Sequence, residues 1–405
     1  MEPKKLGFSG NAAWNTAGLI VYNLCLWATT AVVLRLSDYE KTGVYQLAMT
    51  ISNVFALLAA YDLKIYFVSD TEGRISTGEY RAAQLVSSLA ALALCFVYAL
   101  FCGYRGGVLG CVTAYMLFRV ICTWSEIFWG VQQRHGRMDR IGISNILRGV
   151  LLLVVFTLVL ALTKNPALAS LGMALSALGV FFYDRHAAAR CEDTRFCFRR
   201  GSLKELLLRC LPAVLAVAAF SAVVTVPRQQ LAALCGQEAL GAYATVATPV
   251  VVVQVLVLGL FDPLLRDASE CCRTHDTRRL RSMGLRIGGF LLLTAILALP
   301  FCKYCGAWAL TLLYGESVRE FAYLLYPVVL CTVLFCASWA AVNMLIVLRR
   351  MKLLLLFALL SLAAAALAAP LCIARWSLNG VSYAVLIAYA VFLLPGTATV
   401  LWDLR

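Results

Sequence analysis

The chain consists mainly of long apolar runs that alternate with short clusters of charged residues. Because the hydrocarbon core of a bilayer is about 30 Å thick, one helical crossing needs roughly 20 consecutive apolar residues. About twelve such runs are present. We therefore predict an all-α integral membrane protein with about twelve transmembrane helices. The predicted helices lie near 11–34, 44–63, 82–102, 108–130, 141–162, 167–183, 206–226, 240–261, 287–313, 321–348, 353–373 and 381–401.

The overall composition excludes a soluble fold. Hydrophobic residues make up 62% of the 405 residues and charged residues only 14%, whereas soluble domains carry about 25% charged residues. The first apolar run is flanked only by Lys4 and Lys5 and has no clear small-residue cleavage site. It is therefore predicted to be a retained helix and not a signal peptide.

The sixteen cysteines do not form a recognisable disulfide or metal pattern. Most lie inside apolar runs, where cysteine behaves as a small hydrophobic residue. Cys302 and Cys305 have C-x-x-C spacing, but there is no second pair nearby and the chain has only three histidines. We predict no metal site and no cofactor.

The basic residues indicate an orientation. Of the 35 Lys and Arg, 25 lie at the termini and in one alternating set of loops, 8 lie on the opposite side and 2 lie within helices. Since cytoplasmic loops are enriched in Lys and Arg, both termini are predicted to be cytoplasmic. The net charge of +14 is explained by this topology and by anionic lipid head groups, and not by nucleic-acid binding.

A weak internal repeat divides the chain. Gly43-Val44-Tyr45 and Gly241-Ala242-Tyr243 lie 198 residues apart, and each enters an apolar run. Six crossings separate them, so the two halves share an orientation and would be related by a pseudo-two-fold axis along the membrane normal. The predicted division is a six-helix lobe at 1–184, a basic cytoplasmic linker at 185–205 and a second six-helix lobe at 206–405.

Four segments resemble a known family. They are Leu36-Ser37-Asp38-Tyr39 through Gly43-Val44-Tyr45; Gly130-Val131-Gln132-Gln133 with Arg137 and Arg148; Leu211-Pro212 with Val226-Pro227-Arg228 and Leu240-Gly241-Ala242-Tyr243; and Leu313-Tyr314-Gly315 with Arg349-Arg350-Met351-Lys352. Their order along the chain is similar to that in the Wzx-like polysaccharide transporters of the multidrug/oligosaccharidyl-lipid/polysaccharide (MOP) flippase superfamily.

This resemblance implies a MATE-like fold, with two lobes around a cavity that opens alternately to the two membrane faces. It also implies a cargo, an isoprenoid-diphosphate-linked oligosaccharide that moves from the cytoplasmic to the outer leaflet of a bacterial plasma membrane. A polysaccharide polymerase and other assembly proteins are candidate partners. The chain leaves no room for a thirteenth and fourteenth crossing, which argues against a role in peptidoglycan synthesis.

Arginines within the predicted helices are candidate binding residues, because a charge at the bilayer centre costs about 2.5–3.5 kcal/mol on insertion scales. The guanidinium of Arg119 could bind a diphosphate through two parallel hydrogen bonds. Alternatively, it could form an ion pair with Glu126 or a hydrogen bond to a neighbouring helix. Arg148 could line the same cavity or extend to the interface. Asn145, three residues before it, could bind sugar hydroxyls or pack between helices.

Weaker candidates lie at predicted helix ends. Arg35 and Arg228 are predicted to end the first and seventh helices at corresponding positions on the outer side of the membrane. They could surround the outward opening of the cavity and attract the departing diphosphate, or they could anchor the helices at the membrane interface. Pro212 and Pro227 bracket the seventh helix and could act as hinges or as static kinks.

Two other functions remain open. A cation-coupled exporter of small molecules needs carboxylates inside a lobe, and the sequence places Asp62, Glu126, Asp184 and Asp262 only toward helix ends. A membrane-embedded polysaccharide polymerase or ligase usually has a sizeable outer loop or clustered acid and base residues, and this chain has short outer loops. The sequence therefore favours a non-enzymatic carrier.

Overall fold

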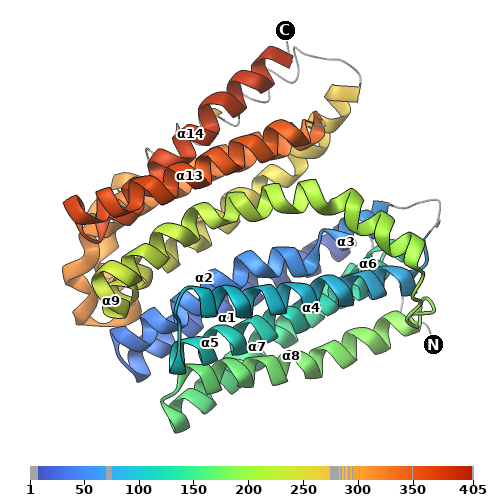
Figure 1. Cartoon of the computed structure of the whole chain (residues 1–405), viewed down its shortest axis with the longest axis horizontal. Helices are drawn as coiled ribbons and strands as arrows, with labels where there is room; N and C mark the ends of the chain where they lie inside the picture. Colours follow the sequence, from blue (N-terminus) through green and yellow to red (C-terminus); the bar gives the residue numbers. More distant parts are fainter. Residues whose placement is uncertain are drawn as a thin grey trace. The chain divides into compact units, whose positions relative to one another are not determined.

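The structure is a computed structural model. It describes residues 8–403 apart from 70–74, 274–281, 283, 284, 287, 291, 294, 295, 297, 301 and 349. Every regular element in this described part is a helix (Figure 1), and ten helical segments are long and apolar enough to cross a membrane. The prediction of an all-helical, multi-pass membrane protein is confirmed.

Contacts between residues group the chain into two units, Met1–Val214 and Leu215–Arg405. The boundary lies inside a helix, further along the chain than the linker at 185–205 that the sequence predicts. Leu206, Cys210 and Val214 belong to a buried cluster of the first unit, together with Leu63 and Phe128. The start of that helix therefore packs as part of unit 1.

The described part of unit 1 holds eight helices before the long helix that crosses the boundary (Figure 1). Local signals set several of their starts: Asp38 accepts a hydrogen bond from the backbone of Lys41, Ser76 and Glu79 form a capping box, and Asn165 caps the last helix. The helices are α1 (Phe8–Leu36), α2 (Tyr39–Ala60), α3 (Leu63–Ser69), α4 (Thr77–Phe101), α5 (Gly106–Trp124), α6 (Glu126–Arg134), α7 (Met138–Thr163) and α8 (Pro166–Ala189).

Small residues allow α1 and α7 to approach closely. A Cβ atom added to Gly142 would collide with the backbone of Trp14, and one added to Gly149 would collide with that of Tyr22. Glycine contacts of this kind are typical of helix pairs in membranes, where backbones pack directly against each other. These contacts pack α7, the helix that carries Arg148, closely against α1.

The long helix α9 (Arg200–Arg273) contains both the seventh and the eighth predicted crossings. The expected end near 226 is wrong, because the helix continues through Pro227 and breaks at Gly236, where φ is 89° and ψ is 169°. Such angles are accessible almost only to glycine. The ninth predicted run, 287–313, falls partly outside the described residues.

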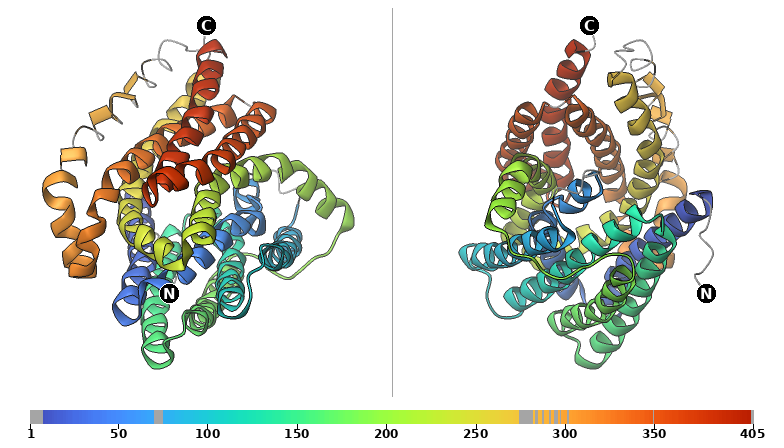
Figure 2. Two further views of the ribbon diagram at one scale, coloured as in Figure 1. Left: turned by 60° about the vertical axis from the view of Figure 1, so that its left-hand side comes forward. Right: turned by 90° about the vertical axis from the view of Figure 1, so that its right-hand side faces the viewer.

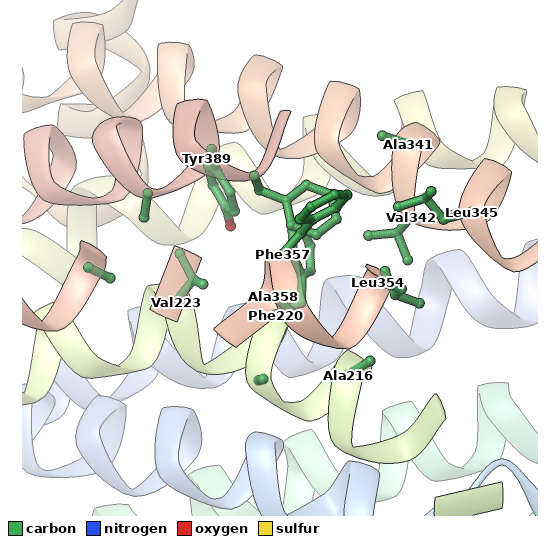
Figure 3. Packing of buried hydrophobic residues seen from close by; sticks show 14 of the residues in the cluster. Ala216, Phe220, Val223, Ala341, Val342, Leu345, Leu354, Phe357, Ala358 and Tyr389 are labelled. Atoms are coloured by element: carbon green, nitrogen blue, oxygen red, sulfur yellow. The ribbon is translucent and has the colours of Figure 1, made fainter. Parts of the chain in front are cut away.

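From Cys302 onward, the described part of unit 2 comprises short helical segments and three long helices, of which α13 and α14 lie side by side in both Figure 1 and Figure 2. Their shared core with α9 and α12 is rich in aromatic residues around Phe220 and Tyr389 (Figure 3). The elements are η1 (Cys302–Gly306), α11 (Ala307–Tyr314), η2 (Glu316–Leu324), α12 (Leu325–Val347), α13 (Met351–Trp376) and α14 (Asn379–Asp403).

Candidate functional site

A buried ion pair connects α7 to α8 in unit 1. The Nη2 atom of Arg148 donates to Oδ2 of Asp184 at 3.2 Å, and the two side chains are 2% and 0% exposed. The guanidinium also lies over the ring of Trp129, 4.7 Å from its centroid. Arg148 is therefore held within unit 1 by Asp184 and Trp129.

Asp184 is the partner that sequence reasoning missed. The aspartate does lie toward the end of α8, as predicted, but it is completely buried. A signal was available: Arg148 lies 15 residues before the end of α7 and Asp184 lies 18 residues after the start of α8. Only Lys164 and Asn165 separate the antiparallel helices α7 and α8, so Arg148 and Asp184 lie at similar distances from this connecting loop.

Further polar groups surround this pair. Ser125, Trp129 and Ser144 all lie near the Asp184 carboxylate. Ser125 Oγ, Ser144 Oγ and Trp129 Nε1 are shielded from solvent, and each lies where it can donate a hydrogen bond to the Asp184 carboxylate. Buried groups of this kind normally find a partner after small adjustments or through water. Asn145, next to Ser144, is also buried, at 5% exposure.

Arg119 lies on α5, five residues before its end, and is half-buried. Its Nε atom is shielded from solvent, and no hydrogen bond or ion pair to this guanidinium is found among the described residues. Tyr22 and Tyr115 lie close enough to interact with its charge. The Tyr115 hydroxyl is buried and likewise has no described partner. The Nε donor of Arg119 thus has no acceptor in the described part of the chain.

Glu126 lies among the cations of unit 1. It begins α6, is half-buried, and interacts electrostatically with Lys64, Arg119 and Arg148. Lys64 also lies over the Trp129 ring, 5.6 Å from its centroid. Sequence reasoning did not identify Lys64, because it belongs to the short helix α3 after the break at Tyr61 and Asp62.

The remaining candidates are dispersed. Arg35 is exposed in the last turn of α1, as predicted. Arg228 is not at a helix end: it lies inside α9, eight residues before Gly236, and its guanidinium lies 5.9 Å from the centre of the Tyr243 ring. Pro212 and Pro227 are both within α9, and Pro212 lies two residues before the end of unit 1.

Comparison with solved structures identifies the fold. An inward-facing multidrug transporter of the MATE family aligns with a TM-score of 0.72 and 13% identity, over 95% of this chain and 94% of that one. The chain has the fold of the MOP-superfamily transporters. An outward-facing MATE transporter aligns over 98% and 95% with a TM-score of 0.65 and 14% identity. A MOP transporter from Pyrococcus furiosus aligns over 97% and 95% with a TM-score of 0.63 and 15% identity.

The sequence comparisons are more restricted. No protein-family model matches the chain. The capsular polysaccharide biosynthesis protein CapF of Staphylococcus aureus is 25% identical over 311 residues, covering 74% of this chain and 76% of that protein. The MOP fold and this relative together support a transporter role.

Proposed function

We propose that this MOP-fold protein is a flippase for an isoprenoid-diphosphate-linked oligosaccharide in the assembly of a cell-surface polysaccharide such as O-antigen, capsule or exopolysaccharide. The observation that carries the proposal is the similarity to a capsular polysaccharide biosynthesis protein across 74% of the chain. The fold supports the proposal, because the solved structures that share it are transporters. The orientation predicted from the basic loops places both termini in the cytoplasm of a bacterial cell.

Arg119 is the residue that we assign to the diphosphate. Its guanidinium has no described ion-pair partner, and the buried hydroxyl of Tyr115 lies near its charge. A guanidinium donates two parallel hydrogen bonds to phosphate oxygens, and a phenol adds a third donor. Asn145, Arg35 and Arg228 remain candidates for other parts of the cargo. Arg148 is assigned a supporting role, because Asp184 already compensates its charge.

The test is flipping of a fluorescent isoprenoid-diphosphate oligosaccharide in proteoliposomes. We expect Arg119→Ala to lower the rate at least tenfold, the loss expected for one charge-assisted hydrogen bond. Arg119→Lys should recover part of the rate, because lysine restores the positive charge but lacks the planar guanidinium that donates two parallel hydrogen bonds. Arg105→Gln is the matched control, because Arg105 precedes the same helix and is exposed.

Two outcomes would contradict the proposal. Equal rates for Arg119→Ala and Arg105→Gln would remove Arg119 from the cargo site. An intact protein that flips no oligosaccharide-lipid across several sugars, but accumulates small organic cations when a Na⁺ or H⁺ gradient is applied, would support the second candidate, a cation-coupled exporter. That candidate is favoured by one observation, the buried carboxylate of Asp184 in unit 1.

A further inference from the structure

An irregular segment, residues 192–198, leads from α8 towards the long helix α9 and lies against the start of α4; we call it the strap. Thr77 Oγ1 donates to Oε2 of Glu192 at 2.7 Å, and the backbone N–H of Cys197 donates to the carbonyl oxygen of Gly78 at 3.3 Å. A Cβ atom added to Gly78 would collide with the backbone of the strap. The strap is therefore held in direct backbone contact with α4.

The strap lies at the edge of the membrane-spanning part of unit 1. One apolar span begins at Thr77, and another ends at Ala189, three residues before the strap begins. Because the strap is hydrogen-bonded to the first two residues of the first span, it lies at the level where hydrocarbon gives way to lipid head groups. The orientation predicted from the basic loops assigns this level to the cytoplasmic side.

Two phenylalanines of the strap are exposed. Phe196 and Phe198 are 49% and 64% exposed, and their rings stack with 6.2 Å between centroids and an interplanar angle of 14°. The guanidinium of Arg81, which donates to the carbonyl oxygen of Thr194, lies 3.9 Å from the centroid of the Phe196 ring and fixes it against the protein. Exposed apolar rings at this level are typical of side chains that contact the membrane interface.

Two arginines flank this aromatic pair in the sequence. The side chain of Arg195 is 92% exposed, and Arg199 is also exposed. Asp193 lies 4.0 Å from Nε of Arg195, but this pair is exposed to solvent, and such pairs are weak. Guanidinium groups bind phosphate oxygens through paired hydrogen bonds. The strap thus combines exposed phosphate-binding groups with exposed apolar rings at the level of the head groups.

We propose that the strap binds the head group of an anionic phospholipid from the adjacent leaflet, with the phosphate on Arg195 and Arg199 and the acyl chains against Phe198. Both kinds of contact are needed for this ligand: the arginines match its charge, and the rings match the boundary of its acyl chains. The surface is separate from the cargo contact proposed at Arg119, and it would bind lipid whether or not the protein is a flippase.

The test is photo-crosslinking of the full-length protein in nanodiscs that contain equal amounts of phosphatidylglycerol and phosphatidylcholine. Phe198 is replaced by p-benzoylphenylalanine, and the crosslinked lipids are identified by mass spectrometry. Since each basic residue near a membrane surface contributes about fivefold in affinity, phosphatidylglycerol should be enriched roughly 25-fold at this position. Arg195→Gln should lower the enrichment about fivefold, and adding Arg199→Gln should abolish it. The same photoreactive residue at Phe101, which is 89% exposed at the other end of α4, should show no enrichment.

Two further double variants separate the strap from general surface charge. Arg195→Lys with Arg199→Lys keeps both charges and should retain most of the enrichment. Arg185→Gln with Arg190→Gln removes two exposed arginines of the α8 end, outside the strap, and should lower the enrichment much less than the glutamine variants of the strap. An equal loss in this α8 variant, or equal lipid ratios at Phe198 and Phe101, would overturn the proposal. Loss of the enrichment when inorganic phosphate is added at constant ionic strength would also overturn it, in favour of a site for a free anion.

Discussion

The buried pair of Arg148 and Asp184 makes a strong prediction about stability. Asp184→Asn keeps the shape of the side chain but leaves the Arg148 guanidinium, which is 2% exposed, without its carboxylate. Removing one partner of a buried ion pair typically costs about 3–5 kcal/mol, because the other charge stays buried and uncompensated. For a unit of about 200 residues, each kcal/mol corresponds to roughly 2–4 °C. We therefore expect the midpoint of unfolding to fall by about 6–20 °C.

The double variant tests the cause. Arg148→Met together with Asp184→Leu replaces both charges by apolar side chains of similar volume, and such replacements of buried pairs are often neutral or stabilising. We expect the double variant to recover most of the loss, with a coupling energy of at least about 2 kcal/mol between the two sites. The simplest assay is thermal unfolding of the purified protein in detergent, followed by intrinsic tryptophan fluorescence and compared at one heating rate.

The control is the exposed pair of Asp193 and Arg195 in the same unit, whose side chains are 75% and 92% exposed. Neutralising Asp193 should change stability by less than about 0.5 kcal/mol. An Asp184→Asn variant as stable as the parent would refute the reasoning, and would mean that Glu126 compensates Arg148 instead. A double variant no better than the single ones would show that packing, and not charge, determines the effect.

Two glycine positions give further predictions. Gly142→Ala should destabilise the protein by about 1–3 kcal/mol, because its new methyl group would collide with the backbone of Trp14. Gly179 has open space around it, so Gly179→Ala should be neutral or slightly stabilising in the same unfolding assay. Gly236→Ala should cost about 1–3 kcal/mol, because φ is 89° there, whereas Gly201→Ala near the start of α9 should not. Equal midpoints for the two variants in either comparison would show that the close contact or the backbone angle does not limit stability.

The long helices follow largely from hydropathy, because each crossing needs an apolar run of a minimum length; the short helices α3 and α6 do not. The ends of helices follow less well. Val226-Pro227 looks like a terminus, since proline removes a backbone donor, yet α9 continues to Gly236. Proline inside a membrane helix is tolerated because neighbouring groups satisfy the freed backbone. The decisive signal was the glycine, whose unusual backbone angles no other residue adopts easily.

The candidate site follows from the sequence only in part. An arginine in an apolar run is conspicuous, so Arg119 and Arg148 could be identified without a structure. Their partners could not be assigned by a search along one helix, because Asp184 reaches Arg148 from the next helix in the chain. The interior position of Arg228 was missed for a related reason: its depth depends on where α9 breaks, and that point was predicted ten residues too early.

These positions change the electrostatic argument about cargo. Counted from the sequence, the charges within the helices are cationic and favour an anion. In the folded unit 1, Asp184 compensates Arg148, and Glu126 lies among Lys64, Arg119 and Arg148. Net charge alone therefore no longer distinguishes a flippase from a cation-coupled exporter. The distinction depends on donor geometry: the shielded Nε atom of Arg119 has no described acceptor, and a cation cannot accept its hydrogen bond, whereas a phosphate oxygen can.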